Sequence, residues 1–426
     1  MTRARVGLGL LLAAVGGVGA VSARGRALAA ERVAAATREA AARSARREAD
    51  IVFFSRRVAR DPLGAADRAR LAALYLQRAR ETAAYDDYRR AERLARRSLT
   101  MRVGHNENTY ALLANALLAQ HRFSEALAAA RALNRSAPGI ASHQALLAEI
   151  ALELGRYGEA RALFDSLRPA QGELAVAPRL ARWAELTGRP EAARRLLARA
   201  RAEAETRRDL PPEQLAWFDL RVGDLALRTG QLDAAEFAFR RGLAVFPGDY
   251  RLLAGLARLE AARARWRRVI DYGDSAVALV PDPATFGLIS DANRRLGDAH
   301  AAAEYAHAME IAVLGQPGQW HRAWSLYLLD HDRRVPEVLA RVQDEIATRR
   351  DVYGFDLLAW ALHKARRDRE ARSAMDSALA LGTRDAQLFS HASAIARALG
   401  DQASERRYSE RARAANPYYR AAEESP

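Results

Sequence analysis

The chain has 426 residues, of which 50% are hydrophobic and 28% charged, so it can bury a core and is not disordered by composition. It contains no cysteine, which excludes disulfides, cysteine-ligated zinc or iron–sulfur sites and a thiol nucleophile. Alanine accounts for 97 residues and isoleucine for 8, a bias that favours helices over a substantial sheet.

The formal net charge is +15, from 67 Lys+Arg against 52 Asp+Glu, and only Lys364 is a lysine. An excess of arginine and alanine is typical of GC-rich codon usage, so the charge is weak evidence for a nucleic-acid partner. Acidic residues alternate with the arginines, as in the segment 78–92. We expect a solvated surface of mixed charge, with an acidic partner or an anionic membrane as the alternative.

The N-terminus has the pattern of an export signal. Arg3 and Arg5 precede an uncharged apolar run at residues 6–21, and Val21-Ser22-Ala23 offers the small residues of a cleavage site. A helix of this run would be about 24 Å long, which is short for a bilayer crossing. We therefore predict a signal peptide at 1–23, with an uncleaved signal anchor and a cytoplasmic protein as the alternatives.

The segment that follows, 24–66, is predicted to be helical and highly charged, with one apolar patch at 51–54. Beyond it a short sequence motif recurs, as in Gly155-Arg156-Tyr157-Gly158-Glu159-Ala160 and Gly230-Gln231-Leu232-Asp233-Ala234-Ala235. The motif recurs about every 34 residues, apart from one interval of 42 residues that contains Pro211-Pro212. At that interval we expect a lengthened helix and a rigid connection.

This repeat resembles the tetratricopeptide repeat (TPR) family. Its best unit, near 216–247, has Val222-Gly223, Ala235, Phe239 and Pro247 at the family's characteristic positions. The resemblance implies pairs of short helices, in which small residues let the two helices approach closely and larger ones fill the space to the next pair. The last units also resemble a group of bacterial repeat proteins.

We therefore predict an all-α fold, a right-handed superhelical solenoid of about ten TPR-like helix-turn-helix units. The segment 24–66 would cap or tether the solenoid, which spans 67–417, and 418–426 would be a frayed tail. The expected units lie near 67–102, 107–138, 141–172, 174–208, 216–247, 250–281, 283–315, 319–350, 352–383 and 386–417.

The sequence carries no recognisable catalytic constellation. It has no phosphate-binding glycine loop and no nucleophile elbow. His300 and His307 are two helical turns apart, too far for one metal, and the neighbours Asp330, His331 and Asp332 point in different directions. We predict a non-enzymatic protein without catalytic residues, metal or cofactor.

The TPR resemblance implies that the first helix of each unit lines a concave groove. Two pairs of aromatic residues, each seven residues apart, fall on that face, although these rings could instead pack between units. The candidate partner-binding residues are Asn108, Asn115, Glu149, Arg182, Trp217, Asp224, Arg228, Arg251, Arg258, Asp291, Arg294, Trp320, Tyr327, His331, Tyr353, Asp356, Trp360 and His363.

Together these features predict an exported scaffold or assembly factor of the bacterial cell envelope, periplasmic or extracellular, that binds a protein or peptide segment in its groove. The alternative is a binder of an anionic polymer (acidic polysaccharide, lipid headgroup or nucleic acid) through the arginine-rich surface. Export argues against nucleic acid, and membrane contact is expected only through an uncleaved N-terminal signal.

Overall fold

The structure is a computed structural model that describes residues 23–316 and 322–420. Residues 1–22 of the predicted signal peptide, Trp320 and tail residues 421–426 lie outside this range. Within the described residues the chain is all helical, without a strand, so the predicted fold class is confirmed. No helix there combines the length and the apolar character needed to cross a membrane.

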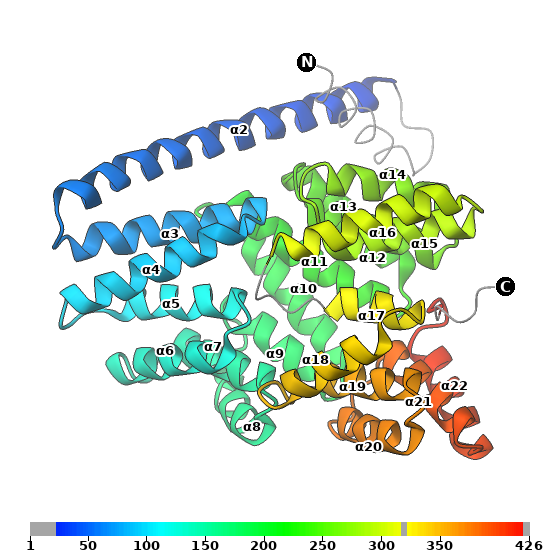
Figure 1. Cartoon of the computed structure of the whole chain (residues 1–426). Coiled ribbons are helices and arrows are strands. Elements are labelled where there is room, and N and C mark those ends of the chain that lie inside the picture. The colour runs from blue at the N-terminus through cyan, green and yellow to red at the C-terminus, as the bar shows by residue number, and fades with distance from the viewer. Residues whose placement is uncertain (1–22, 317–321, 421–426) are drawn as a thin grey trace.

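The helices follow one another as antiparallel pairs after a long first helix (Figure 1). Their bounds are α2 (Ala23–Arg60), α3 (Ala65–Thr82), α4 (Tyr85–Met101), α5 (Glu107–Ala119), α6 (Phe123–Ser136), α7 (Ala141–Glu153), α8 (Tyr157–Ser166), the 3₁₀ helix η1 (Arg168–Ala170), α9 (Ala177–Leu186), α10 (Pro190–Thr206), α11 (Pro212–Arg228), α12 (Leu232–Val245), α13 (Tyr250–Ala262), α14 (Trp266–Val277), α15 (Pro283–Arg295), α16 (Ala299–Leu314), α17 (Arg322–Asp330), α18 (Val335–Ile346), α19 (Val352–Lys364), α20 (Asp368–Leu379), α21 (Ala386–Ala398) and α22 (Gln402–Ala415).

From α3 onward, each expected unit range contains one helix pair. Small residues stand where the helices of a pair approach: a Cβ atom on Gly223 would lie 2.4 Å from the Phe239 ring, and Ala235 is fully buried. Two bounds differ from the expected units, since α3 begins at Ala65 and α11 begins at Pro212, where proline suits the first turn. At the long interval both α10 and α11 have 17 residues, so the helices on either side of Pro211 are lengthened.

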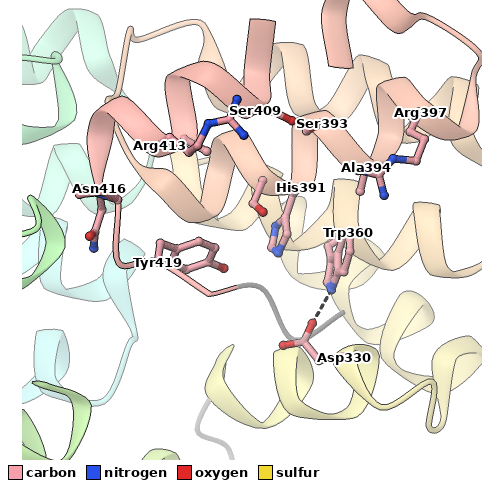
Figure 2. A pocket seen from close by; sticks show the side chains of 13 residues that line it. Asp330, Trp360, His391, Ser393, Ala394, Arg397, Ser409, Arg413, Asn416 and Tyr419 are labelled. Atoms are coloured by element: carbon pink, nitrogen blue, oxygen red, sulfur yellow. Dashed lines mark hydrogen bonds between the residues drawn. The ribbon is translucent and has the colours of Figure 1, made fainter. Parts of the chain in front are cut away.

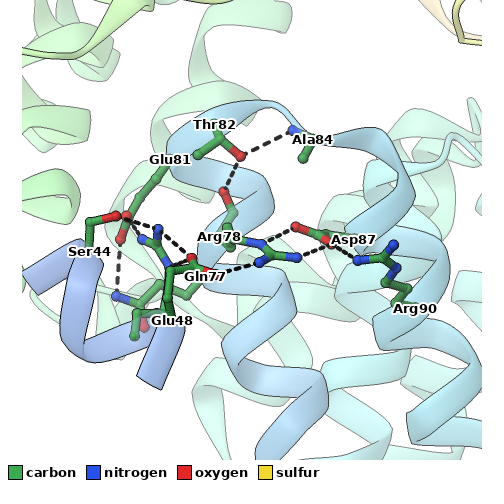
Figure 3. A network of polar contacts seen from close by, with 10 residues as sticks. Ser44, Glu48, Gln77, Arg78, Glu81, Thr82, Ala84, Asp87 and Arg90 are labelled. Carbon is green, nitrogen blue, oxygen red and sulfur yellow. Dashed lines mark hydrogen bonds and ion pairs between the residues drawn. The ribbon is translucent and has the colours of Figure 1, made fainter. Parts of the chain in front are cut away.

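The long helix α2 packs against the first pair through an apolar seam and a polar network. Ile51 is buried against Leu71 and Leu74 of α3. Arg78 of α3 donates to Glu48 of α2 at 2.6 Å and to Asp87 of α4 at 2.6 and 2.8 Å, so one guanidinium joins three helices (Figure 3). The segment predicted to cap or tether the solenoid is thus fastened to it along its second half.

The array curls back on itself, so that its last two pairs lie against the turns of earlier pairs. The Val352 amide donates to the Tyr157 hydroxyl at 2.7 Å, and the Thr383 hydroxyl donates to the Leu186 carbonyl at 2.6 Å. A third bond runs from the Asn416 side-chain amide to the Leu227 carbonyl at 3.1 Å. We call these three bonds the closure contacts; they join residues 189 to 197 positions apart.

Glycines make the first two closure contacts sterically possible. A Cβ atom on Gly155 would lie 2.1 Å from the Arg350 carbonyl oxygen, and one on Gly188 would lie 2.3 Å from the Gly382 carbonyl oxygen. Both glycines also have positive φ, +71° and +70°, as the turn between paired helices requires. The closed arrangement encloses the inner faces of the first helices of the pairs.

Candidate interior groove

The residues proposed for the groove lie on the first helix of a pair, apart from His331, which follows α17 directly, and Trp320, which is not described. About half of them line four cavities, which share lining residues and so form one interior groove. Arg251 contributes to three of the cavities, and Tyr419 contributes to two.

The largest of these four cavities, about 790 Å³, lies between α7, α9 and α11, and we call it the arginine cavity. Four predicted residues meet here: Glu149, Arg182, Trp217 and Arg251. Further arginines also line it, together with an apolar floor: Arg80, Arg179, Arg221, Leu152, Phe164, Leu174, Leu210 and Phe218. The cavity therefore combines positive charge with a large apolar surface.

A neighbouring cavity of about 690 Å³ lies along α13 and α15 and brings together Asp224, Arg251, Arg258, Asp291 and Tyr327. Its charged residues are paired between adjacent units. Arg258 donates to Asp224 at 2.8 Å, and His331 Nε2 lies 2.8 Å from Asp291 Oδ1. The pairs form a ladder along the inner face, which holds neighbouring first helices side by side.

The first pair of the array reaches a third cavity, of about 390 Å³, across the interior. Arg80 and Tyr88 line it from one side, and Tyr250, Arg251 and Arg322 line it from the other. Burial raises the pKa of Tyr250 to about 12, because the desolvated phenol resists ionisation. Residues far apart in sequence therefore share one interior surface.

The fourth cavity, about 330 Å³, is lined by Trp360, His391 and the C-terminal residue Tyr419 (Figure 2). The Trp360 ring stacks on His391 at 4.1 Å between centroids and donates through Nε1 to Asp330 at 2.8 Å. Burial, opposed by His391 and by this hydrogen bond, raises the pKa of Asp330. Tyr419 belongs to the segment 418–426, which we predicted to be frayed; instead it packs here.

Two predicted aromatic anchors prove to be core residues. Tyr327 is 5% exposed and bonds through its hydroxyl to Ser290, while Trp360 is 3% exposed. Both belong to the apolar cluster that joins α16 through α21. The sequence left open whether these rings face the groove or pack between units, and their burial agrees with packing between units, because the same helical face supplies the contacts between successive units.

The remaining predicted residues line none of the four cavities. Arg228 bonds to Glu185, and Asp356 is buried between His391 and Arg322. Arg182 and Arg322 both lie over the Tyr353 ring, at 5.2 and 5.1 Å. Asn108, Asn115, Arg294 and His363 stay outside the cavities, with Asn108 and Asn115 exposed on α5.

Sequence reasoning missed several groove residues. Arg179 is the sixth residue of the unit that begins at 174, and Arg221 is the sixth residue of the unit that begins at 216. None of the candidate residues predicted from the TPR resemblance stands at the sixth position of a unit. Including it would have found both. Arg80 and Tyr419 reach the groove only through the closure of the array, for which the local pattern gives no signal.

The described residues contain no cluster of three or more histidine, aspartate or glutamate side chains able to hold a metal. His391 Nδ1 lies 2.7 Å from Asp356 Oδ1, a pairing that occurs in hydrolytic sites. The neighbouring Ser393 hydroxyl bonds instead to Ser409 and to the Glu405 carbonyl. The Asp–His pair is thus part of the packing between α19 and α21.

No family model matches this chain, and no curated protein matches it. Among solved structures it is similar to PilW, a widely conserved type IV pilus biogenesis factor, with 20% identity over 53% of this chain and 100% of that one, and a TM-score of 0.41. The Cut9–Hcn1 hetero-tetramer of the APC/C shares 13% identity over 91% and 94%, with a TM-score of 0.36.

The human IFIT1 dimer with PPP-AAAA shares 13% identity over 82% of this chain and 90% of that one, with a TM-score of 0.45. These identities are too low to indicate a shared partner, and they show only a general likeness of helical-repeat architecture. The described helix pairs have the TPR-type architecture that the sequence predicted.

Proposed function

We propose that this chain is a non-enzymatic scaffold or assembly factor of the bacterial cell envelope, which binds a segment of a protein partner in its interior groove. The observation that carries the proposal is the arginine cavity. A cavity of about 790 Å³ that combines five arginines with a half-buried Trp217 has the aromatic and arginine side chains that dominate protein interfaces.

Location in the envelope is the part of the proposal that rests on the N-terminal pattern. Arg3 and Arg5 followed by the apolar run 6–21 form an export signal in the sequence. The all-helical repeat architecture supports an interaction role in general.

The ion pairs favour this role over binding of an anionic polymer. Many arginines are already neutralised by acids on neighbouring helices, as where Arg122 bonds both Glu92 and Glu125, and where Arg263 bonds Glu236. Pairing of this kind reduces the charge that the surface offers to a polyanion. Inside the groove, by contrast, the arginines of the arginine cavity lie beside an apolar surface, which suits a protein segment better than a polyanion.

The test is site-specific photo-crosslinking of the full chain in its own cells. A photoreactive phenylalanine replaces Trp217 in the arginine cavity or, as the control, Phe237, which is 65% exposed on α12 and outside that cavity. We expect one envelope protein to crosslink from position 217 and not from position 237. Equal crosslinking from both positions, or a partner that resides in the cytoplasm, would contradict the proposal.

A further inference from the structure

Next to the arginine cavity, three arginines are grouped around one buried carboxylate, and two of the three also line the cavity. Glu185 of α9 accepts from Arg182 at 3.1 Å, from Arg221 at 3.4 Å and from Arg228 of the next unit. Glu185 is 8% exposed, so these contacts lie away from bulk water. We call these four residues the Glu185 cluster.

The Glu185 cluster has more positive than negative charge. Burial alone would raise the pKa of Glu185, yet Arg228, Arg182 and Arg221 hold that pKa below its ordinary value. Desolvation, opposed by Glu185 but assisted by Arg228 and Arg182, lowers the pKa of Arg221. Arg221 therefore lacks a full counter-charge in the folded chain.

Other acids near the cluster have ion-pair partners of their own. Glu149 accepts from Arg179 at 2.7 Å, and Asp224 accepts from Arg258 at 2.8 Å. The Glu153 carboxylate lies 3.8 Å from Arg349. Counted by direct ion pairs, the three guanidinium groups of the cluster therefore share one carboxylate, and other acids act on them only at longer range.

Two arginines of the cluster, Arg182 and Arg221, also line the cavity, beside an apolar surface. Phe218 is buried and Trp217 half-buried, and their rings meet edge to face at 5.1 Å. A small inorganic anion would use the charge and leave this apolar wall wet. A peptide segment with a carboxylate side chain beside a large apolar side chain satisfies both.

We propose that the arginine cavity binds an acidic peptide segment, with a glutamate or aspartate side chain of the partner held by Arg182 and Arg221 and an adjacent large apolar residue seated against Trp217 and Phe218. This assignment rests on the proposed function and names the chemistry of its partner. The acidic group supplies the counter-charge that the Glu185 cluster lacks.

The test uses defined peptides and the full chain. The acidic probe is Gly-Ser-Glu-Leu-Phe-Glu-Ser-Gly, labelled with fluorescein and amidated at the C-terminus so that no terminal carboxylate is present. In the second probe glutamine replaces both glutamates, and in the third alanine replaces Leu-Phe. Fluorescence anisotropy gives the Kd of each probe at low and at high salt.

We expect the acidic probe to bind at least about tenfold more tightly than either of the other probes, with binding that weakens as salt rises. Arg221→Gln should abolish the preference for glutamate over glutamine. Because Arg221 has the longest bond to Glu185 and an incompletely compensated charge, this variant should keep the melting temperature of the wild type or exceed it. Arg199→Gln, an exposed change on α10 outside the cavity, is the matched control.

Equal affinity for the acidic and neutral probes, no binding of any probe, or a preference that survives Arg221→Gln would each overturn the assignment. The crosslinking experiment at position 217 separates this failure from failure of the proposed function. If the envelope partner still crosslinks in the Arg221→Gln chain with unchanged yield, the groove binds a partner but does not read its acidic residues.

Discussion

Glu185 shows how one buried carboxylate can hold two adjacent repeat units together. It bonds Arg182 of its own helix and Arg221 and Arg228 of α11. Removing one partner of a buried ion pair leaves uncompensated charge, which costs far more than the pair itself contributes. The cluster is therefore sensitive to loss of its acid and tolerant of losing an arginine.

We predict that Glu185→Gln lowers the free energy of unfolding by about 3–5 kcal/mol, because three guanidinium groups lose their shared partner. Glu205 is 66% exposed, and its partner Arg201 keeps a second ion pair with Asp219, so Glu205→Gln should change that free energy by less than about 1 kcal/mol. Thermal melting followed by circular dichroism compares the two. Equal losses in both variants would show that the Glu185 cluster does not stabilise the fold.

Glu345 of α18 predicts a dependence of stability on pH. Burial raises its pKa from 4.5 to about 8, aided by Asp351 and opposed by Arg349 and Arg341. The folded chain thus holds this proton more tightly than the unfolded chain does. The free energy of unfolding should therefore fall as pH rises from about 4.5 to about 8.

Glu345→Gln removes that fall, since glutamine resembles the protonated acid. We expect the variant to melt above the wild type at pH 8.5 and at the same temperature near pH 4.5. Asp344→Asn, an exposed change at the preceding position of α18, controls for a general effect of lost negative charge. A difference between Glu345→Gln and wild type that stays constant across this pH range would refute the assignment.

The candidate site was predictable only where a residue's position in its helix decided its surroundings. Glu149, Arg182, Trp217 and Arg251 do meet in one cavity, because equivalent positions of successive first helices face the same interior. Tyr327 and Trp360 lie on the same helical face as these residues, but their side chains are buried. Whether a ring on that face is covered depends on the volume supplied by the next unit, which periodicity does not encode.

At the scale of elements, the recurring motif before each second helix and the spacing of small residues predicted where helix pairs occur. Hydrophobic periodicity and turn glycines act over a few residues, so they predict the positions of helices well. They say little about α2, whose attachment depends on side chains such as Arg78 that reach three helices.

We predict that Arg78→Met loosens α2 from the first pair. The change keeps the apolar stem but removes the bonds to Glu48 and Asp87, and it leaves the buried Asp87 paired with Arg90 at 3.4 Å. Hydrogen exchange measured by mass spectrometry should quicken in the α2 amides at 44–58.

Arg57→Met is the matched control for this change. Arg57 also joins α2 to α3, through Asp67 at 2.9 Å, but its side chain is 54% exposed, so its ion pair should contribute little. Equal exchange rates in the two variants would mean that the Arg78 bonds do not hold α2, and that the apolar seam around Ile51 and the Arg47–Glu81 ion pair suffice.

At the scale of the whole molecule, the closure contacts convert an extended repeat into a ring-like interior. Each joins a turn to a loop about six units further along the chain, at separations of 189 to 197 residues. Small rotations between successive units accumulate and bring these loops together. The sequence of a single repeat does not indicate the total rotation. For this reason the sequence predicted the units but not the enclosed groove.

We predict that Gly188→Ala opens the closure, because the new methyl group would lie 2.3 Å from the Gly382 carbonyl oxygen. Gly400→Ala is the control: Gly400 has a similar φ of +73°, but a Cβ atom there meets nothing within 4 Å. Both variants pay about 1–2 kcal/mol for the left-handed backbone, so a difference between them reports the contact itself. Thr383→Val, which removes a closure hydrogen bond without a clash, should shift the molecule in the same direction by less.

Small-angle X-ray scattering measures the outcome. The radius of gyration should rise for Gly188→Ala and stay at the wild-type value for Gly400→Ala, while helical content is unchanged in both. Crosslinking from position 217 should fall in the opened chain, since the Tyr353 ring, which packs on Arg182 at 5.2 Å across the closure, would no longer support that wall of the arginine cavity. The contrary result is that Gly188→Ala keeps the wild-type radius of gyration and melts at the same temperature as Gly400→Ala. In that case the contact between turns does not hold the array closed, and the groove is shaped by the stacking of neighbouring units alone.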